Sequence, residues 1–405
     1  MSISIQWITG GGVTSPKGYK ACGIAAGLKV DRTDMALLAS DRPAHCAGLF
    51  TSNNVPAAPV LYDKPLVAKG KARAVIVNVG CANACTGEPG RRDAACMGET
   101  AAKALGIPAE EMLVCSTGTI GRRLAMDRIL AGIPQLAEGL SAGGGSDAAW
   151  AILTTDTVPK QAAVHFEANG RVYTVGGMCK GAGMICPNLA TTLIFLTTDA
   201  KVSASALRKA VKIGAEHSFN RITVDGDQST NDTLLLFANG AAGGPALAPG
   251  KPGWSEFLDA VSAVQLSLAQ QIVRDGEGAT KFVTVSVEKA ATPADALAAC
   301  RAIANSPLFK TACFGGDPNW GRVISAVGNS GADCAELETE IYFDKVCVFD
   351  KGVVADEQAN EALSSVMAQR AFTVRVVLNR GTCADAVYTT DFSYEYVKIN
   401  GEYTT

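Results

Sequence analysis

Residues 179–193 read Cys-Lys-Gly-Ala-Gly-Met-Ile-Cys-Pro-Asn-Leu-Ala-Thr-Thr-Leu, a glycine-rich run that ends at two threonines and opens an apolar run at 193–196. Glycine lets a backbone turn sharply and approach another group closely. A threonine at the end of such a turn can act as a nucleophile, and a cut before it would give it an α-amine of pKa ~8 as its own base. Taken alone, the pattern favours a plainer structure, a glycine-rich loop that leads into a buried strand.

The sequence on either side predicts that this stretch lies at the end of a sheet. Two alternating runs, 164–167 and 171–175, flank Asn169-Gly170. Asn-Gly is a strong hairpin signal because both residues tolerate positive φ. The hairpin leads directly into the glycine-rich stretch, so a nucleophile there would sit on a rigid scaffold. A further buried strand is predicted at 72–79.

Helices are predicted at 203–217 and 255–274. In the second, apolar residues recur at three- and four-residue spacing on one face, and Ser255 is the expected N-cap. The run Ser-Ala-Gly-Gly-Gly-Ser at 141–146 is interpreted as a flexible loop between a helix and the next unit.

The C-terminal part alternates between strands and helices. A helix is predicted at 293–305, with Thr292 as its cap. A second helix is predicted at 356–369, and the predicted strands are 281–287, 323–327, 340–349, 372–378 and 386–390. This order, βαββαβ when the last strand is counted, suggests a split βαβ unit and a smaller lobe over 281–395.

Composition narrows the class of protein. The chain of 405 residues can bury a large core in two or three units, and 48% hydrophobic with 19% charged residues argues against disorder. The net charge of −3 gives no electrostatic case for binding nucleic acid or an anionic membrane. No apolar run is long enough to predict a transmembrane helix, and residues 1–7 resemble neither a signal nor a transit peptide. We therefore expect a cytoplasmic protein.

Cysteines and histidines give no sign of a disulfide framework or a catalytic triad. The 13 cysteines include no Cys-x-x-Cys pair, which fits buried thiols in a reducing compartment. Cys179 and Cys186, which flank the glycine-rich stretch, are expected to pack rather than react. Because no Gly-x-Ser-x-Gly elbow occurs, His45, His165 and His217 are interpreted as structural.

Several acidic residues could suggest a divalent metal. Asp225-Gly226-Asp227 is too short and lacks the spacing of a calcium loop. The expected role of the acidic side chains is to cap turns, and no metal is predicted. The residues considered are Asp225, Asp227, Asp232 and Asp317.

Short motifs occur in a fixed order along the chain. They are GGGVT at 10–14, AGLFT at 47–51, ANACTG at 82–87, CSTG at 115–118, TTDT at 154–157, SFNRITVDGD at 218–227, DGEG at 275–278, FGGDPNWGR at 314–322 and YVKIN at 396–400. Together with residues 179–193, this set resembles the ornithine acetyltransferases, also called glutamate N-acetyltransferases, of arginine biosynthesis. The resemblance spreads over essentially the whole chain, and the ordered set is very specific.

The resemblance implies a self-cleaving acyltransferase. In that family the precursor cuts itself before a threonine, which here places the cut between Ala190 and Thr191. The Thr191 hydroxyl would take the acetyl group of N2-acetylornithine and pass it to glutamate through an acetyl-Thr191 ester, with ping-pong kinetics. Thr117 and Gly118 match the family's oxyanion pair, and one such donor is worth about 3 kcal/mol in the transition state.

The resemblance also implies a set of substrate ligands. Lys180 matches the basic ligand and Glu277 the acidic one, which would face the ornithine ammonium. Thr154, Asn400 and the terminal Thr405 match the remaining polar ligands, beside Thr191 itself. Without the resemblance, Lys180 and Glu277 would be interpreted as solvated loop charges.

The chain departs from the family pattern at two positions. Thr192 stands where methionine usually follows the nucleophile, so two adjacent hydroxyls compete for the role, and the register after Ala190 favours Thr191. Cys81 stands after Gly80 where the family usually has asparagine.

The resemblance implies an α/β (α+β) fold, a layered αββα-type sandwich with a smaller C-terminal α/β lobe. The products of the cut would be an α chain, 1–190, and a β chain, 191–405, paired in a heterotetramer. No cofactor is predicted, and acetyl-CoA is considered as a second acetyl donor. Two alternatives stay open: a self-cleaving N-terminal-threonine aminopeptidase or amidase, and an uncut, non-catalytic relative that binds a small metabolite.

Overall fold

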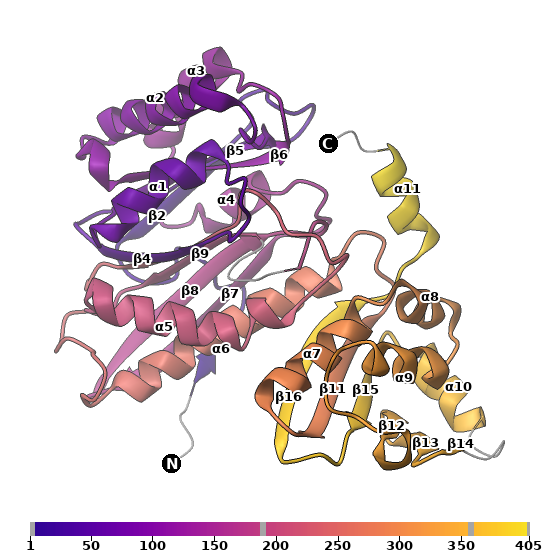
Figure 1. The fold of residues 1–405 in the computed structure, drawn as a ribbon. Coiled ribbons are helices and arrows are strands. Elements are labelled where there is room, and N and C mark those ends of the chain that lie inside the picture. Colours follow the sequence, from indigo (N-terminus) through magenta and orange to yellow (C-terminus); the bar gives the residue numbers. More distant parts are fainter. Residues whose placement is uncertain (1–4, 187–191, 355–359, 403–405) are drawn as a thin grey trace. The chain divides into compact units, whose positions relative to one another are not determined.

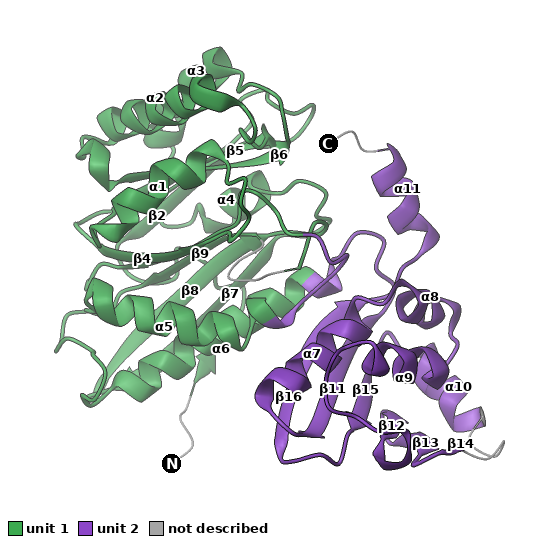
Figure 2. Cartoon of the chain, viewed as in Figure 1, with its two compact units in different colours: residues 1–220, 228–272, 405 green, residues 221–227, 273–404 purple. Residues whose placement is uncertain are grey.

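The computed structural model describes residues 5–186, 192–354 and 360–402 (Figure 1). The chain divides into two compact units (Figure 2). The first contains the described residues of Met1–Asn220 and Gln228–Ile272, and the second those of Arg221–Asp227 and Val273–Thr404. The second unit encloses the range 281–395.

The larger sheet of the first unit has six strands in the order β1-β7-β8-β9-β10-β4. These strands are β1 (Gln6–Trp7), β4 (His45–Phe50), β7 (Lys160–Ala168), β8 (Arg171–Lys180), β9 (Leu193–Thr198) and β10 (Thr233–Ala238). β9 and β10 are parallel, and the other neighbours are antiparallel. The predicted hairpin is confirmed as β7–β8, with φ of 55° at Asn169 and 68° at Gly170.

The smaller sheet of the first unit has four strands in the order β2-β3-β5-β6. They are β2 (Tyr19–Ile24), β3 (Met35–Ser40), β5 (Ala74–Cys81) and β6 (Met112–Thr119). The predicted strand at 72–79 is confirmed as β5, which lies parallel to β6. The carboxyl ends of these two strands therefore meet at one edge of the sheet.

The two sheets pack face to face between helices. An apolar core joins them through Leu38 and Val77 of the smaller sheet and Phe195 and Phe237 of the larger one. The outer face of the smaller sheet is covered by α2 (Gly87–Leu105) and α3 (Met126–Glu138). The larger sheet packs against α5 (Ala204–Glu216) and α6 (Trp254–Arg274), and a Cβ on Gly177 of β8 would lie 2.9 Å from a Leu268 side-chain atom of α6. Two shorter helices are α1 (Ala58–Ala68) and α4 (Gly145–Ala151). The αββα-type sandwich is thus confirmed in this unit.

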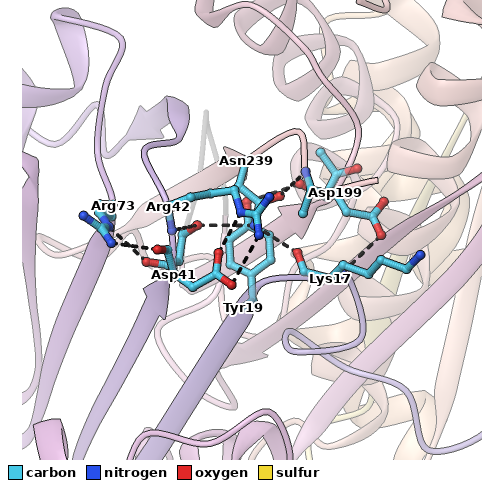
Figure 3. A network of polar contacts seen from close by, with 10 residues as sticks. Lys17, Tyr19, Asp41, Arg42, Arg73, Asp199 and Asn239 are labelled. Atoms are coloured by element: carbon cyan, nitrogen blue, oxygen red, sulfur yellow. Dashed lines mark hydrogen bonds and ion pairs between the residues drawn. The ribbon is translucent and has the colours of Figure 1, made fainter. Parts of the chain in front are cut away.

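A polar network joins the two sheets at one end (Figure 3). The Tyr19 hydroxyl at the start of β2 donates to the Thr198 carbonyl at the end of β9, at 3.2 Å. Asp199 accepts from the backbone N–H groups of Lys17 and Thr174, and Asn239 donates to the Lys17 carbonyl. Because β9 ends here, the start of β9 lies at the opposite end of the sandwich.

Two local predictions for the first unit are wrong. Ser255 is not an N-cap, because α6 begins one residue earlier at Trp254 and the Ser255 hydroxyl donates to Glu256. The run 141–146 does not separate units. Ser141 exchanges two backbone hydrogen bonds with Ala21, and Gly145 already belongs to α4.

The second unit is built on a six-stranded sheet in the order β14-β13-β12-β15-β11-β16. Its strands are β11 (Phe282–Ala290), β12 (Glu340–Phe343), β13 (Val346–Asp350), β14 (Val353–Val354), β15 (Ala371–Val377) and β16 (Cys383–Thr390). Its described helices are α7 (Pro293–Ala304), α8 (Pro307–Gly315), α9 (Trp320–Gly328), α10 (Asn360–Ala368) and α11 (Tyr394–Glu402). Thr292 caps α7 as predicted, accepting from the N–H of Asp295.

Two strands predicted from the sequence of this unit are wrong. Residues 323–327 are not a strand but the middle of α9, whose N-cap Asn319 accepts from the Arg322 N–H. Val323 and Val327 are both buried, and their spacing of four is that of a helix face. Residues 340–349 are not one strand but the hairpin β12–β13, with Asp344 at a φ of 50° in the turn.

Within the described ranges, every helix is too short or too polar to cross a lipid bilayer.

Candidate active site

The glycine-rich stretch joins the end of β8 to the start of β9. Lys180, the last residue of β8, pairs with Leu193, the first residue of β9. Ala190 and Thr191, the predicted cleavage site and nucleophile, lie outside the described residues, so their predicted roles are untested by the structure. The described residues on both sides of them form the site.

Lys180 contacts the predicted oxyanion pair directly. Its Nζ donates to the Thr117 Oγ1 at 3.2 Å, although 63 residues separate them in sequence. Thr117 is buried near the carboxyl end of β6, in the other sheet of the sandwich. Two of the predicted site residues are therefore neighbours, and both sheets contribute to the site.

Gly118 occupies a position that only glycine fits. Its φ is 130°, in the region that other residues rarely adopt. A Cβ on Gly118 would lie 2.4 Å from the carbonyl carbon of Gly80 on the neighbouring strand. The absence of a side chain therefore lets the ends of β5 and β6 approach each other closely beside Thr117.

Asp156 holds the end of β8 in place. Its Oδ1 accepts the backbone N–H of Gly181 at 2.7 Å and pairs with the Lys160 ammonium at 2.6 Å, and the ion pair is fully buried. Burial alone would raise the pKa of Asp156, but the positive charges of Lys160 and Lys180 outweigh it and lower the pKa to about 2. Asp156 is thus ionised at neutral pH and balances the positive charge at the site.

Thr154 belongs to the same cluster. Its N–H and hydroxyl both donate to the Asp156 Oδ2, at 3.1 and 3.4 Å. Its carbonyl oxygen accepts from Lys29 at 3.3 Å and from Arg32 at 3.2 Å. The pKa of Lys29 is lowered to about 8, mainly by burial and to a smaller extent by repulsion from Arg32 and Lys180. The cluster thus brings several cations together, and such groups bind carboxylates and phosphates well.

Thr192 directly precedes β9, and the alternation of side chains along this strand indicates which face its side chain occupies. Leu193 points into the core between the sheets. Because side chains alternate along a strand, Thr192 points the other way. A Cβ on Gly181 would lie 2.6 Å from the Thr192 Cγ2, whereas the preceding Lys180 points to Thr117. The Thr192 hydroxyl therefore lies on the face away from the Lys180–Thr117 contact.

Asp232 and Thr192 directly precede the paired first residues of β10 and β9, and the Thr233 N–H donates to the Thr192 carbonyl at 2.8 Å. Asp232 is 2% exposed, and its Oδ2 has no hydrogen-bond partner among the described residues. Burial raises its pKa well above the ordinary value, against the lowering effects of Ser229 and Lys180. Asn231 next to it donates to the Ser116 carbonyl at 2.8 Å and so ties β6 to the larger sheet.

Glu277 and Asn400 meet within the second unit. The Asn400 side-chain amide donates to the Glu277 Oε2 at 2.8 Å. The hydroxyl of Ser393, just before α11, donates to the carbonyl of Gly278, so the start of this helix is anchored next to Glu277. Thr405, the other predicted ligand of the tail, lies outside the described residues.

Sequence reasoning missed Asp156, Lys160 and Lys29 as members of the site. The motif at 154–157 was noted, but only Thr154 received a role. A usable signal was the Asp156–Lys160 pair, two opposite charges four residues apart in an otherwise uncharged segment that runs into a strand. Lys29 and Asp232 carried no comparable local signal, because the fold brings them to the site from distant parts of the chain.

Several of the cysteines and histidines considered from the sequence are buried in the protein or hydrogen-bonded to other groups of the chain. Cys179 is fully buried, and burial raises the pKa of its thiol, which disfavours the reactive thiolate. Cys81 donates from its thiol to the Arg122 carbonyl at 3.1 Å. His45 bonds the Val202 carbonyl and His165 the Thr174 hydroxyl. Among the described residues, no three His, Cys, Asp or Glu side chains cluster in a way that would hold a metal ion.

The fold and the site define a class: a layered αββα protein whose polar site lies where the ends of strands from both sheets meet. Comparison with known proteins identifies the family within this class. The chain belongs to the ArgJ family, whose model matches residues 20–405.

Full-length relatives agree with this family. The chain is 48% identical over 405 residues to the arginine biosynthesis bifunctional protein ArgJ of Symbiobacterium thermophilum, covering 99% of this chain and 100% of the relative. It is 49% identical over 390 residues to the protein of the same name from Geobacter sulfurreducens, covering 96% and 99%. The crystal structure of ornithine acetyltransferase from Mycobacterium tuberculosis, complexed with ornithine, is 45% identical over 46% of this chain and 100% of its own, with a TM-score of 0.43.

Proposed function

We propose that this protein moves the acetyl group of N2-acetylornithine to glutamate in arginine biosynthesis, and that it also accepts acetyl-CoA as a donor. Its full-length relatives are named bifunctional proteins of arginine biosynthesis, which supports an activity in that pathway. The observation that carries the proposal is the contact of Lys180 with Thr117, next to Gly118. It brings a basic group for a substrate carboxylate to the predicted oxyanion pair, at the end of the strand that precedes the predicted nucleophile.

The chemistry begins with cleavage between Ala190 and Thr191. The Thr191 hydroxyl attacks the Ala190 carbonyl carbon, the peptide C–N bond breaks, and water releases the resulting ester. The new α-amine then serves as the base that takes the hydroxyl proton when Thr191 attacks the acetyl carbonyl of the donor. Backbone N–H groups at Thr117 and Gly118 would stabilise the oxyanion, and glutamate would take the acetyl group in the second half-reaction.

Thr191 rather than Thr192 is the proposed nucleophile. The Thr192 hydroxyl lies on the face of the sheet that points away from Lys180 and Thr117. The position of Thr192 thus supports the choice that the register after Ala190 had favoured.

The remaining roles follow the chemistry of the substrates. Ornithine carries a carboxylate and a distal ammonium, whereas glutamate carries two carboxylates. We assign the carboxylates to Lys180 and the ornithine ammonium to Glu277, with Thr154, Asn400 and Thr405 as further polar ligands. The Asn400–Glu277 hydrogen bond would orient the Glu277 carboxylate for this role.

We further propose that the α chain, 1–190, and the β chain, 191–405, stay together in a heterotetramer in the cytoplasm and need no cofactor. The assay that tests the proposed function is acetyl transfer from N-acetylornithine to glutamate by the purified protein, followed by mass spectrometry of both products. We expect stoichiometric formation of ornithine and N-acetylglutamate. Release of acetate without N-acetylglutamate would instead favour the amidase alternative.

A further inference from the structure

A pocket of about 160 Å³ opens at the carboxyl end of β5, on the face of the smaller sheet that α3 covers. Its walls come from Leu28, from the end of β5 at 78–81, and from the segment 122–129 that leads into α3. Three arginines line the pocket, namely Arg122, Arg123 and Arg128. None of the lining residues is acidic. Guanidinium groups around a cavity without carboxylates favour an anionic ligand, above all a phosphate.

Two of the arginines are held in place by the protein. Arg123 donates Nε and Nη2 to the Asp93 Oδ2 at 2.9 and 2.7 Å, and Arg128 donates to the Gly27 carbonyl. Each keeps further N–H groups for a ligand, because a guanidinium has five. Arg122 is exposed, and among the described residues no carboxylate lies within 4.0 Å of it. Its charge is therefore uncompensated at the pocket.

The first turn of α3 adds to the positive potential. Ala125, at the N-cap of this 13-residue helix, makes no side-chain capping hydrogen bond, and it lines the pocket. The N-terminal N–H groups of a helix carry partial positive charge and suit an anion. Asp127 in the same turn opposes this field, but it is exposed and does not line the pocket.

The pocket adjoins the candidate active site. Gly80 of its wall pairs with Gly118 of the predicted oxyanion pair. Leu28 of its wall precedes Lys29, whose ammonium donates to the Thr154 carbonyl. The pocket and Thr117 thus lie at the same paired ends of β5 and β6.

We propose that this pocket binds the phosphate-bearing part of a nucleotide thioester donor of the coenzyme A class. The flexible arm of the donor would pass the ends of β5 and β6 and present its thioester at Thr117. There the thioester C–S bond breaks, the acetyl carbon bonds to the Thr191 oxygen, and the hydroxyl proton passes to the departing thiolate. The inference rests on the proposed function. N-acetylornithine carries no phosphate, so the pocket would serve only one of the two donors.

The test compares both donors in the Arg122→Ala and Arg122→Glu variants, with Arg92→Ala, an exposed arginine of α2, as the matched control. We expect the KM for acetyl-CoA to rise about tenfold in Arg122→Ala, as for one lost charge-assisted hydrogen bond, and further in Arg122→Glu. The KM for N-acetylornithine should not change, and Arg92→Ala should behave as wild type with both donors.

Calorimetric titration with free coenzyme A gives an independent measurement. Binding to the wild type should weaken with added salt and should be weaker still in Arg122→Glu. Failure of the wild type to bind coenzyme A, or parallel KM changes for both donors, would overturn the inference. Loss of transfer from N-acetylornithine in the wild type would instead refute the proposed function, while coenzyme A binding would still report on the pocket.

Discussion

At the scale of single residues, the surroundings of Thr192 bear on which of the two adjacent threonines is the nucleophile. Thr192 is 5% exposed, and its hydroxyl finds no hydrogen-bond partner among the described residues. A buried hydroxyl without a partner costs stability, because it has given up its bonds to water. A residue that serves only to fill space at this position should therefore tolerate an apolar replacement of the same shape.

We predict that Thr192→Val retains cleavage and acetyl transfer. Its unfolding free energy should rise by about 1 kcal/mol, since a methyl group replaces the unpartnered hydroxyl. Steady-state transfer kinetics and chemical denaturation would measure both quantities. A Thr192→Val protein that neither cleaves nor transfers acetyl would identify Thr192 as the nucleophile.

At the scale of elements, the end of β8 depends on a buried charge. Asp156 accepts the Gly181 N–H and pairs with Lys160, and both side chains are fully buried. Removing one member of a buried ion pair typically costs about 3–5 kcal/mol, because the other charge stays in a poorly solvated place. The strand end that carries Lys180 is therefore held by electrostatics as well as by the ladder of the sheet.

We predict that Asp156→Asn lowers the unfolding free energy by about 3 kcal/mol at pH 7. The pKa of Asp156 is about 2 in the folded protein and near 3.9 in an unfolded chain, so the carboxylate stabilises the fold above pH ~4. This contribution is lost as the pH falls towards 2. Thermal unfolding from pH 6 to 3 should show the gap between wild type and Asp156→Asn narrowing with acidity.

The exposed residue Asp127 offers a matched control, since Asp127→Asn removes only a weak interaction with the first turn of α3 and should shift the melting temperature far less than Asp156→Asn. A gap between wild type and Asp156→Asn that stays constant down to pH 3 would show that the Asp156 charge does not stabilise the fold.

The sequence predicted elements well wherever a local signal was strong. Asn169-Gly170 marked the β7–β8 turn, and Thr292 marked the start of α7. The prediction of a strand at 323–327 was wrong, because a short apolar run fits a strand or a helix equally well. The N-cap at Asn319 is the feature that distinguishes the helix here. At the site, the resemblance supplied Thr117 and Lys180. Asp156 and Lys29 could not be predicted, because their roles arise from contacts between segments that the fold brings together.

At the scale of the whole molecule, the proposed cleavage would divide the first unit between two chains. β8 precedes the predicted cut and β9 follows it, and the two are neighbours in one sheet. Because the sheet's ladder and the core between the sheets span both sides of the cut, the two products should stay associated after cleavage. We therefore expect the α and β chains to elute together in native size-exclusion chromatography.

The proposed activity depends on one event, the exposure of a threonine that carries both nucleophile and base. The most direct test is intact-mass spectrometry of the active protein after incubation with N-acetylornithine, beside a Thr191→Ala variant. We predict two polypeptides, 1–190 and 191–405, with a single acetyl group on Thr191 of the second, and one undivided, inactive chain for Thr191→Ala. An active wild type found only as the undivided chain of 41.8 kDa, or an acetyl group trapped on any other residue, would contradict the account.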